Sequence, residues 1–267
     1  MLAEARGFMF DLDGTLVQRS RDGLIALPGA AEVIAAVRRS GRPLVVFTNA
    51  SHVAPAEIAR ELAQAGLELR DDEVITPVCS AMRYLAGRLP DRAVVVLGSE
   101  DTRRRMADAG VVVLADADGA DPGAVFVAHV DEAVLAVLER AARAVQRGAA
   151  FLTANYAAAY AGRDGPIFSR GAMVTAAIAK AAGRRPTVVG KPSRAALREV
   201  TSRLGVAAAS IAVIGDDIGM DIALGRIGGS TTVLVRSGIS AGTPDPGGRK
   251  GPDLVIDGIS DLISMLG

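Results

Sequence analysis

Cysteine, histidine and aromatic side chains are scarce in this sequence. Its 267 residues include one cysteine (Cys79), two histidines, no tryptophan, three tyrosines and six phenylalanines. A single cysteine cannot form an internal disulfide, which is typical of proteins from a reducing cytoplasm. Without a cluster of His and Cys residues, we expect no zinc site. The core must therefore be built mainly from Ala, Val, Leu and Ile.

The sequence also lacks an excess of charge of either sign, and it lacks long apolar runs. Thirty basic residues balance thirty acidic residues, which argues against a general nucleic-acid or membrane-surface binder. No apolar run approaches the ~20 residues that a membrane helix needs, and the first residues do not form the apolar core of a signal peptide. We therefore expect a cytoplasmic protein with no nucleic-acid or membrane partner.

Half of the residues are apolar, and they form short β-branched runs that alternate with alanine-rich segments. This alternation predicts βα units around a mostly parallel sheet. We expect strands near residues 7–11, 43–47, 93–98, 111–114, 124–128, 149–153, 187–190, 211–214, 231–235 and 253–256. We expect helices near residues 29–39, 55–65, 77–89, 100–109, 131–147, 172–182, 193–204 and 259–266, and one more after residue 217.

The order of these elements predicts two domains. A second group of strands and helices starts near residue 93, and the first group resumes near residue 187. We therefore predict a core made of residues 1–78 and 185–267, with an inserted α/β domain at 79–184. The Gly- and Pro-containing segments 116–123 and 162–166 are expected to be polar connections, and the segment before Leu27 an irregular loop or small hairpin.

Asp11 and Asp13 end the first apolar run and precede Gly14. On a strand, residues i and i+2 share one face, so these two carboxylates should emerge together. They repel each other unless a cation, a proton or a reacting group lies between them. The alternative is an ordinary polar turn, because Asp and Gly are common turn residues.

Three later strands of the expected core also end in polar residues. In an open parallel sheet, ligands bind outside the carboxyl ends of the strands. Carboxylates hold Mg²⁺, whereas ammonium groups, hydroxyls and helix N-terminal amides hold phosphate oxygens. The sequence therefore predicts a metal and phosphate site, with a simple ion pair of the lysine as the alternative. Its residues are Asp11, Asp13, Thr48, Asn49, Lys191, Asp216 and Asp217.

In order and spacing, four segments resemble the four motifs of the haloacid dehalogenase (HAD) superfamily. They are Asp11-Leu12-Asp13-Gly14-Thr15-Leu16, Thr48-Asn49, Gly190-Lys191-Pro192, and Gly215-Asp216-Asp217 with Asp221. The step Leu27-Pro28-Gly29-Ala30 and the Gly-Lys-Pro form of the third motif are similar to the NagD/4-nitrophenylphosphatase group, subfamily IIA. The resemblance covers nearly the whole chain. It implies a doubly wound, Rossmann-like core with an inserted α/β cap domain of the C2 type.

The resemblance also implies a role for each motif residue. Asp11 would be the nucleophile that forms an aspartyl-phosphate, and Asp13 the general acid and base. Thr48, Asn49 and Lys191 would bind the phosphate. Mg²⁺ would be held by Asp11, Asp216 and the backbone carbonyl of Asp13, with Asp217 and Asp221 outside the metal's ligands. Asn155 of the inserted domain would contact the substrate.

Three segments depart from the subfamily's pattern. Ala50 replaces the usual second Asn of the second motif, and Met220 stands where a threonine commonly precedes the last aspartate. Segment 152–157 lacks the Pro-Asp of the subfamily's Thr-Asn-Pro-Asp. This last segment lies where a cap domain would face the leaving group, so the departures bear mainly on the identity of the substrate.

We therefore predict a Mg²⁺-dependent phosphatase that acts on small phosphomonoesters of the nucleotide, sugar, glycerol or pyridoxal phosphate type. Asp13 favours a phosphatase, because superfamily ATPases carry threonine there and dehalogenases lack the second aspartate. The alternatives are a phosphotransferase or mutase with the same intermediate, a phosphate-accepting signalling module without turnover, and a binding protein with an inactive site. A helix of the inserted domain with exposed Ala, Val and Leu could form a homodimer interface, or the same pattern could be satisfied by packing within that domain.

Overall fold

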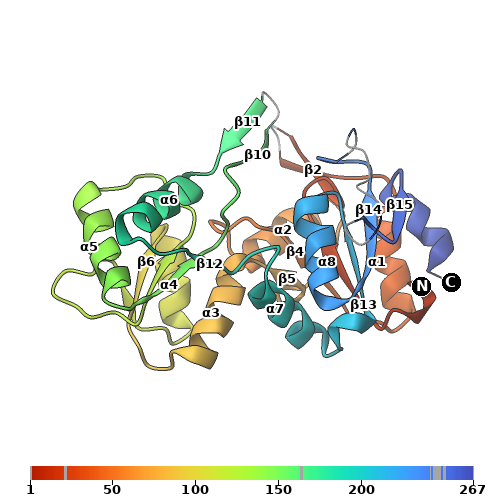
Figure 1. The fold of residues 1–267 in the computed structure, drawn as a ribbon. Coiled ribbons are helices and arrows are strands. Elements are labelled where there is room, and N and C mark those ends of the chain that lie inside the picture. The colour runs from red at the N-terminus through yellow and green to blue at the C-terminus, as the bar shows by residue number, and fades with distance from the viewer. Residues whose placement is uncertain are drawn as a thin grey trace. The chain divides into compact units, whose positions relative to one another are not determined.

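The chain forms two compact units (Figure 1). The computed structural model describes residues 2–20, 23–162, 165–240, 242, 248 and 251–266. The first unit comprises Met1–Thr48, Pro55–Ile75 and Lys191–Gly267, and the second comprises Asn49–Ala54 and Thr76–Gly190. The second unit thus begins at residue 76 and ends at residue 190, whereas the sequence analysis placed these limits at 79 and 184. It also includes Asn49–Ala54, which the sequence analysis placed in the core.

The first unit is built on a parallel sheet of order β15-β14-β13-β1-β4-β5. Its strands are β1 (Gly7–Asp11), β4 (Leu44–Phe47), β5 (Val74–Ile75), β13 (Ile211–Gly215), β14 (Thr231–Val235) and β15 (Leu254–Ile256). β1, β4 and β13 are buried along their whole length, which explains why they are continuous apolar runs rather than alternating ones. The hairpin β2 (Val17–Ser20) and β3 (Gly23–Ala26) follows β1 directly.

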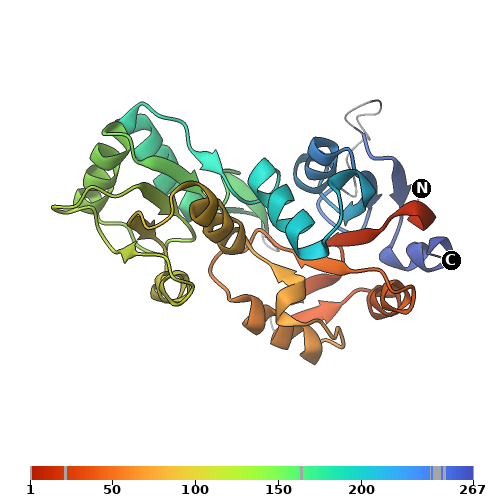
Figure 2. The ribbon, with the colours of Figure 1, turned by 90° about the horizontal axis from the view of Figure 1, so that it is seen from below.

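Helices cover both faces of this sheet, as Figure 2 shows. They are α1 (Ala30–Arg39), α2 (Pro55–Gln64), α7 (Arg194–Leu204) and α8 (Ala223–Gly228), together with a π-helical turn, η4 (Ile218–Ile222). Four short 3₁₀ segments complete the unit: η1 (Leu2–Glu4), η2 (Asp71–Glu73), η3 (Ala208–Ser210) and η6 (Ile259–Met265). This is the predicted doubly wound parallel sheet.

The second unit has its own parallel sheet, of order β12-β9-β8-β6-β7. The strands are β6 (Val94–Leu97), β7 (Val113–Leu114), β8 (Ala124–Val127), β9 (Ala150–Thr153) and β12 (Thr187–Val188), and a separate hairpin pairs β10 (Ala159–Gly162) with β11 (Gly165–Phe168). The helices are α3 (Pro77–Arg88), α4 (Glu100–Asp108), α5 (Leu135–Gln146) and α6 (Arg170–Ala182). Its core is mainly aliphatic, with Phe126 and Phe151 as buried aromatic residues, as the scarcity of aromatic residues predicts.

The structure corrects the sequence analysis at several elements. β12 was expected in the core sheet, but Val188 pairs with Thr153 of β9 in the second unit. The segment expected as a polar connection at 162–166 carries the ends of β10 and β11, although Arg163 and Asp164 lie outside the described residues. α5 begins at residue 135 rather than 131, the two-residue strand β5 was missed, and the C-terminal helix is 3₁₀ rather than α.

Among the described residues, no helix combines the length and the apolar character required to cross a bilayer.

Candidate active site

The register of the core sheet brings the predicted motif residues to one edge. Asp11 is the last residue of β1 and lies opposite Phe47, the last residue of β4. On the other side of β1, Phe10 pairs with Ile214 of β13. The residues that follow these two neighbouring strands, Thr48 and Asp216, therefore flank Asp11 at the carboxyl edge of the sheet.

Lys191 is buried at this edge and contacts two carboxylates. Its Nζ donates to Asp11 Oδ1 at 2.5 Å and to Asp221 Oδ1 at 2.7 Å. Burial favours the neutral amine, but Asp11 and Asp221 outweigh it and raise the pKa of Lys191 above its ordinary value. Lys191 is therefore a fixed positive charge beside Asp11. The ring of Phe47 lies under it, 5.6 Å from Nζ to the ring centroid.

Asp216 belongs to a cluster of three carboxylates with Asp11 and Asp221. One oxygen from each of the three lies within 4.8 Å of the others. Burial, followed by the charges of Asp11 and Asp221, raises the pKa of Asp216 to about 8, although the backbone N–H of Ile239 donates to its Oδ2 at 2.6 Å. Three carboxylates this close repel one another unless a proton or a cation lies between them.

Two glycines leave space around the Asp216 carboxylate. A Cβ at Gly238 would lie 1.8 Å from Asp216 Oδ2, and a Cβ at Gly14 would lie 2.5 Å from the same oxygen. Gly14 also has a φ of 86°, which side chains rarely adopt. Carboxylate oxygens are ligands that Mg²⁺ prefers, and the cluster offers one from each of its three residues. The residues present therefore fit this ion.

The Asp13 side chain is not part of the carboxylate cluster and pairs with Arg19. Arg19 Nε lies 2.7 Å from Asp13 Oδ1, and both side chains are nearly half exposed. Partial burial raises the pKa of Asp13, and the charge of Asp11 raises it further, while Arg19 opposes both effects. If Asp13 contributes to a metal site, it must do so through its backbone carbonyl, because its carboxylate is not a member of the cluster.

Asp221 and Asp217 organise the segment after β13. Asp221 Oδ1 accepts from Lys191, and its Oδ2 accepts from the backbone N–H of Asp217 at 3.2 Å. Burial raises the pKa of Asp221 to about 7 even though Lys191 opposes the shift. Gly215 provides the space for this side chain, since a Cβ there would lie 2.2 Å from the Asp221 carboxylate. Asp217 Oδ1 instead accepts from the N–H groups of Gly219 and Met220, which caps η4.

The structure does not place every predicted site residue in this cluster. Thr48 is buried at the end of β4, and its N–H donates to the carbonyl of Ile75 at 3.2 Å. Asn49 and Asn155 belong to the second unit. The side chain of Asn155 accepts from the N–H of Ala157 at 2.9 Å, which closes a local turn. The first unit therefore assembles Asp11, Asp13, Thr48, Lys191, Asp216, Asp217 and Asp221.

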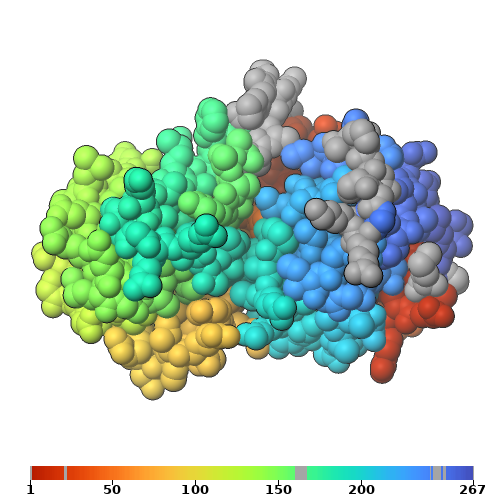
Figure 3. Space-filling view, in the orientation of Figure 1, coloured from red at the N-terminus to blue at the C-terminus, as the bar shows by residue number. Residues whose placement is uncertain are grey.

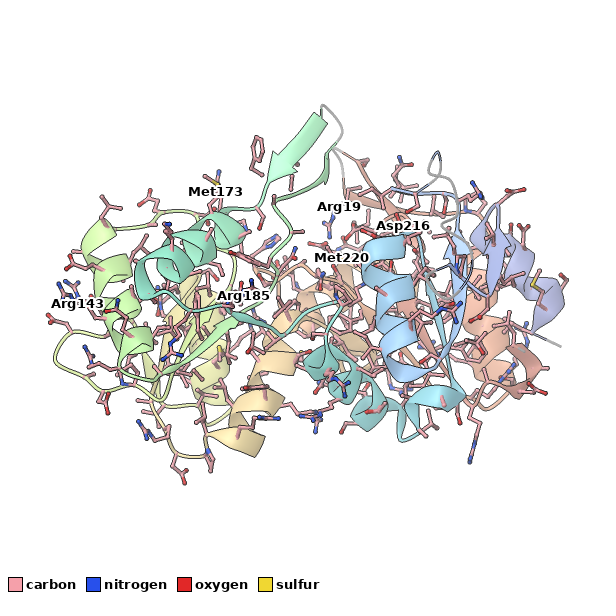
Figure 4. All side chains as sticks on the ribbon, in the orientation of Figure 1. Arg19, Arg143, Met173, Arg185, Asp216 and Met220 are labelled. Atoms are coloured by element: carbon pink, nitrogen blue, oxygen red, sulfur yellow. The ribbon has the colours of Figure 1, made fainter. Side chains whose placement is uncertain are left out.

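Several residues at this edge were missed by the sequence analysis. Thr15 donates to Asp11 Oδ2 at 3.4 Å, and Ser237 donates to the carbonyl of Gly14 at 2.7 Å. The segment that follows β14, the next strand of the sheet, contains Ser237, Gly238 and Ile239. A polar residue and a glycine at the carboxyl end of a strand could have indicated that this segment reaches the site. Figure 4 shows Arg19 and Asp216 on the same side of the first unit. No motif singled out Arg19.

Comparison with known proteins identifies the family. The model of haloacid dehalogenase-like hydrolases matches residues 8–112, and a HAD-hydrolase-like model matches residues 188–262. The chain is 32% identical to human chronophin over 252 residues, which cover 90% of this chain and 84% of chronophin. It is 25% identical to an acid sugar phosphatase of Staphylococcus epidermidis over 243 residues, 88% of each protein.

A solved structure agrees with these matches over nearly the whole chain. The p-nitrophenyl phosphatase from Archaeoglobus fulgidus superposes with a TM-score of 0.84 and 26% identity, and the match covers 98% of this chain and 99% of that one. The predicted fold and the resemblance to 4-nitrophenylphosphatases are thereby confirmed. The chain belongs to the family of haloacid dehalogenase-like hydrolases.

Proposed function

We propose that this hydrolase is a Mg²⁺-dependent phosphatase that hydrolyses small phosphomonoesters through an aspartyl-phosphate on Asp11. The observation that carries the proposal is the setting of the Asp11 carboxylate. It ends the central strand, pairs with the buried Lys191, and lies within the cluster formed with Asp216 and Asp221. The similarity to an acid sugar phosphatase and a p-nitrophenyl phosphatase supports the same reaction class.

In the first half-reaction, a carboxylate oxygen of Asp11 attacks phosphorus while the bond from phosphorus to the ester oxygen breaks. Asp13 gives its proton to the departing oxygen, so the product leaves as an alcohol. The raised pKa of Asp13 supports this role, because the reaction must start from the protonated acid. The ammonium of Lys191 offsets negative charge on Asp11 and on the transferred phosphoryl group.

In the second half-reaction, water attacks the phosphorus of the aspartyl-phosphate, and the bond to Asp11 breaks. Asp13, now a carboxylate, takes the proton of the attacking water, and inorganic phosphate and the Asp11 carboxylate are restored. The Thr48 hydroxyl and the backbone N–H of Asn49 would hold phosphate oxygens during both steps. The position of Thr48 beside Asp11 at the sheet edge supports this assignment.

Asp11, Asp216 and the backbone carbonyl of Asp13 would hold the Mg²⁺. When bound, the ion supplies positive charge that neutralises the phosphate oxygens. Asp221 would instead hold Lys191 and the backbone of Asp217, whose N–H groups donate to its two oxygens, and so act outside the metal's ligands. Asp217 would contribute only as the N-terminal cap of η4.

The substrate would be a small metabolite of the nucleotide, sugar, glycerol or pyridoxal phosphate type. We propose that the second unit serves as a cap domain that selects the leaving group, with Asn155 among its contacts. The enzyme would act in the cytoplasm, an assignment supported by the single, buried and unpaired Cys79.

The test is phosphate release from a panel of phosphomonoesters, measured with Mg²⁺ and with EDTA. We expect release with Mg²⁺ alone, and we expect Asp11→Asn to lower the rate by about 10⁴-fold or more, as for other catalytic nucleophiles. Asp217→Ala is the matched control: it should keep turnover and lose about 1 kcal/mol of stability through the missing N-cap. Turnover by Asp11→Asn would refute the nucleophile. Alcohol release without equivalent phosphate release would indicate a phosphotransferase instead.

We also propose that two copies of the chain associate through α5 of the second unit. Val134 and Leu135 at the start of this helix are 64% and 81% exposed. Their position beside a groove between α5 and α6 supports an apolar contact. Figure 3 shows this helical face of the second unit in green and teal.

A further inference from the structure

Arg19 lies beside the proposed general acid without being buried. It belongs to β2, the first strand of the hairpin that follows the Asp11–Asp13 turn. Its Nε is 2.7 Å from Asp13 Oδ1, and its Nη2 donates to Asp13 Oδ2 at 3.5 Å. The side chains of Arg19 and Asp13 are 48% and 41% exposed. A bound molecule can therefore reach both side chains, while the Oδ1 atom of Asp13 is itself buried.

The contact with Asp13 uses only one edge of the guanidinium. An arginine has five N–H donors in a planar fork, and the side-on pairing with Asp13 occupies Nε and part of Nη2. Nη1 has no partner among the residues that the structure describes. The end-on edge, formed by Nη1 and Nη2, is therefore available for the two-point contact that arginine makes with a carboxylate or a phosphate.

The position of Asp13 determines which part of the substrate would meet this edge. If Asp13 protonates the leaving oxygen, the leaving group must lie against Asp13 and hence near Arg19. An acidic leaving group there is repelled by the carboxylate of Asp11, and by that of Asp13 once Asp13 has given up its proton, unless a cation offsets these charges. Lys191 is already paired with Asp11 and Asp221, whereas Arg19 keeps an open edge.

We infer that Arg19 is a specificity-determining residue that binds an acidic group, a carboxylate or a second phosphate, on the leaving-group side of the substrate. This inference rests on the proposed phosphatase function. The substrate is then a phosphomonoester of an acidic alcohol rather than of a neutral one. A partly exposed site with arginine at its edge would select such molecules by charge and by the geometry of the fork.

The test compares kcat/KM within two matched pairs of substrates. Carboxymethyl phosphate against ethyl phosphate differs by a carboxylate, and 1,3-propanediol bisphosphate against propyl phosphate differs by a second phosphate. We expect the wild-type enzyme to favour the acidic member of at least one pair by about tenfold, a typical value for one charge-assisted contact. The pair that shows the preference identifies the acidic group.

The variant Arg19→Gln should remove this preference. Its rates on all substrates should also fall by a common factor, because Asp13 loses its partner, so the decisive quantity is the ratio within each pair. Arg19→Lys should keep part of the ratio, since it retains the charge but not the fork. Arg143→Gln is the matched control, because Arg143 makes an exposed ion pair with Glu139 on α5. Figure 4 labels both Arg143 and Arg19. Loss of Arg143 should not change the ratio of kcat/KM within either pair.

Two results would overturn the role of Arg19: a wild-type enzyme without preference in either pair, or a preference that survives in Arg19→Gln. Failure of the proposed function is a different result, in which no substrate releases phosphate with Mg²⁺. In that case, calorimetric binding of the same pairs to Asp11→Asn and to Asp11→Asn/Arg19→Gln decides the question. Tighter binding of the acidic member that depends on Arg19 would support the recognition role, and equal binding would refute it.

Discussion

At the residue scale, ionisation of the Asp216 carboxylate is unfavourable in the folded protein. Its pKa rises to about 8 from an ordinary value of 3.8 because it is buried beside Asp11 and Asp221. The folded state therefore binds a proton at Asp216 more tightly than the unfolded state does. The stability associated with this proton is present below the unfolded pKa and is lost as the pH rises through the window from about 4 to about 8.

Because the pKa of Asp216 is raised in the folded state, we predict that Asp216→Asn stabilises the metal-free protein at pH 8 but not at pH 4.5. Asn keeps the shape and can still accept the N–H of Ile239, but it carries no charge. The free energy of unfolding of the variant at pH 8 should exceed that of the wild type by a value on the order of 2 kcal/mol. Urea unfolding in EDTA at the two pH values measures it.

With Mg²⁺ at pH 8, we expect the wild type to be more stable than Asp216→Asn. A cation that binds the folded wild type stabilises it by mass action, whereas Asp216→Asn has lost a proposed ligand and should respond weakly. The same unfolding curves in MgCl₂ at pH 8 provide this comparison. A stability difference between the two proteins that is the same at both pH values would contradict the assignment of the buried charge to Asp216.

At the residue scale, the sequence predicts side chains that sit at the ends of regular strands and misses those that arrive from loops. Asp11 and Asp216 could be placed because strand register brings the carboxyl ends of neighbouring strands together. Arg19 reaches Asp13 from a hairpin, and Gly238 approaches Asp216 after β14, along paths that no periodicity specifies. The positions of such side chains, carried by a hairpin or by the segment after a strand, depend on the tertiary fold.

At the element scale, the main error concerns β12. Its residues, Thr187 and Val188, have strand propensity in either sheet, so local sequence could not decide between them. Hydrogen bonds to the second unit place this strand in the second sheet: Val189 N–H donates to the carbonyl of Thr153, and Gly190 N–H donates to that of Ala154. Lys191 therefore enters the first unit from a strand of the second sheet, and the start of α7, capped by Ser193, follows directly.

Arg42, in the connection between α1 and β4, joins both ends of the first unit. Its Nη1 donates to the carbonyls of Leu2 and Ala5 at 3.1 and 3.4 Å, and its Nη2 donates to that of Leu266 at 3.0 Å. The guanidinium also stacks on Phe8 of β1, 4.8 Å from the ring centroid. One side chain thus satisfies backbone groups of η1 and of the segment after η6.

We therefore predict that Arg42→Ala lowers the free energy of unfolding by roughly 1–3 kcal/mol, because three carbonyls lose a charged donor. The midpoint of urea unfolding at neutral pH measures this change. The matched control is Arg39→Ala at the exposed end of α1, which should stay within about 0.5 kcal/mol of the wild type. Equal effects of the two substitutions would show that Arg42 does not join the ends of the unit.

At the scale of the whole molecule, the two units are connected at catalytic positions. The chain crosses between the units four times, and two of these crossings lie directly after Thr48 and directly before Lys191, so each of these residues is bonded to the second unit. Within the second unit, the residues on the other side of these bonds pack closely. A Cβ at Gly190 would lie 2.6 Å from Asn49 Oδ1 and 2.3 Å from the carbonyl oxygen of Ala154. The proposed phosphate contacts are therefore coupled to the second unit through the backbone itself.

The proposed association of two copies gives the last prediction. Leu135 is 81% exposed, so its replacement by glutamate removes nothing from the core and should leave the fold and turnover intact. If α5 forms the interface, two glutamates must be desolvated there, and Leu135→Glu should shift the protein from dimer to monomer. Light scattering over a range of protein concentrations measures the mass. Ile227→Glu on α8, a position 43% exposed in the first unit, is the control and should keep the mass of the wild type. A wild-type mass of one chain at all concentrations, or a dimer that persists in Leu135→Glu, would refute this interface.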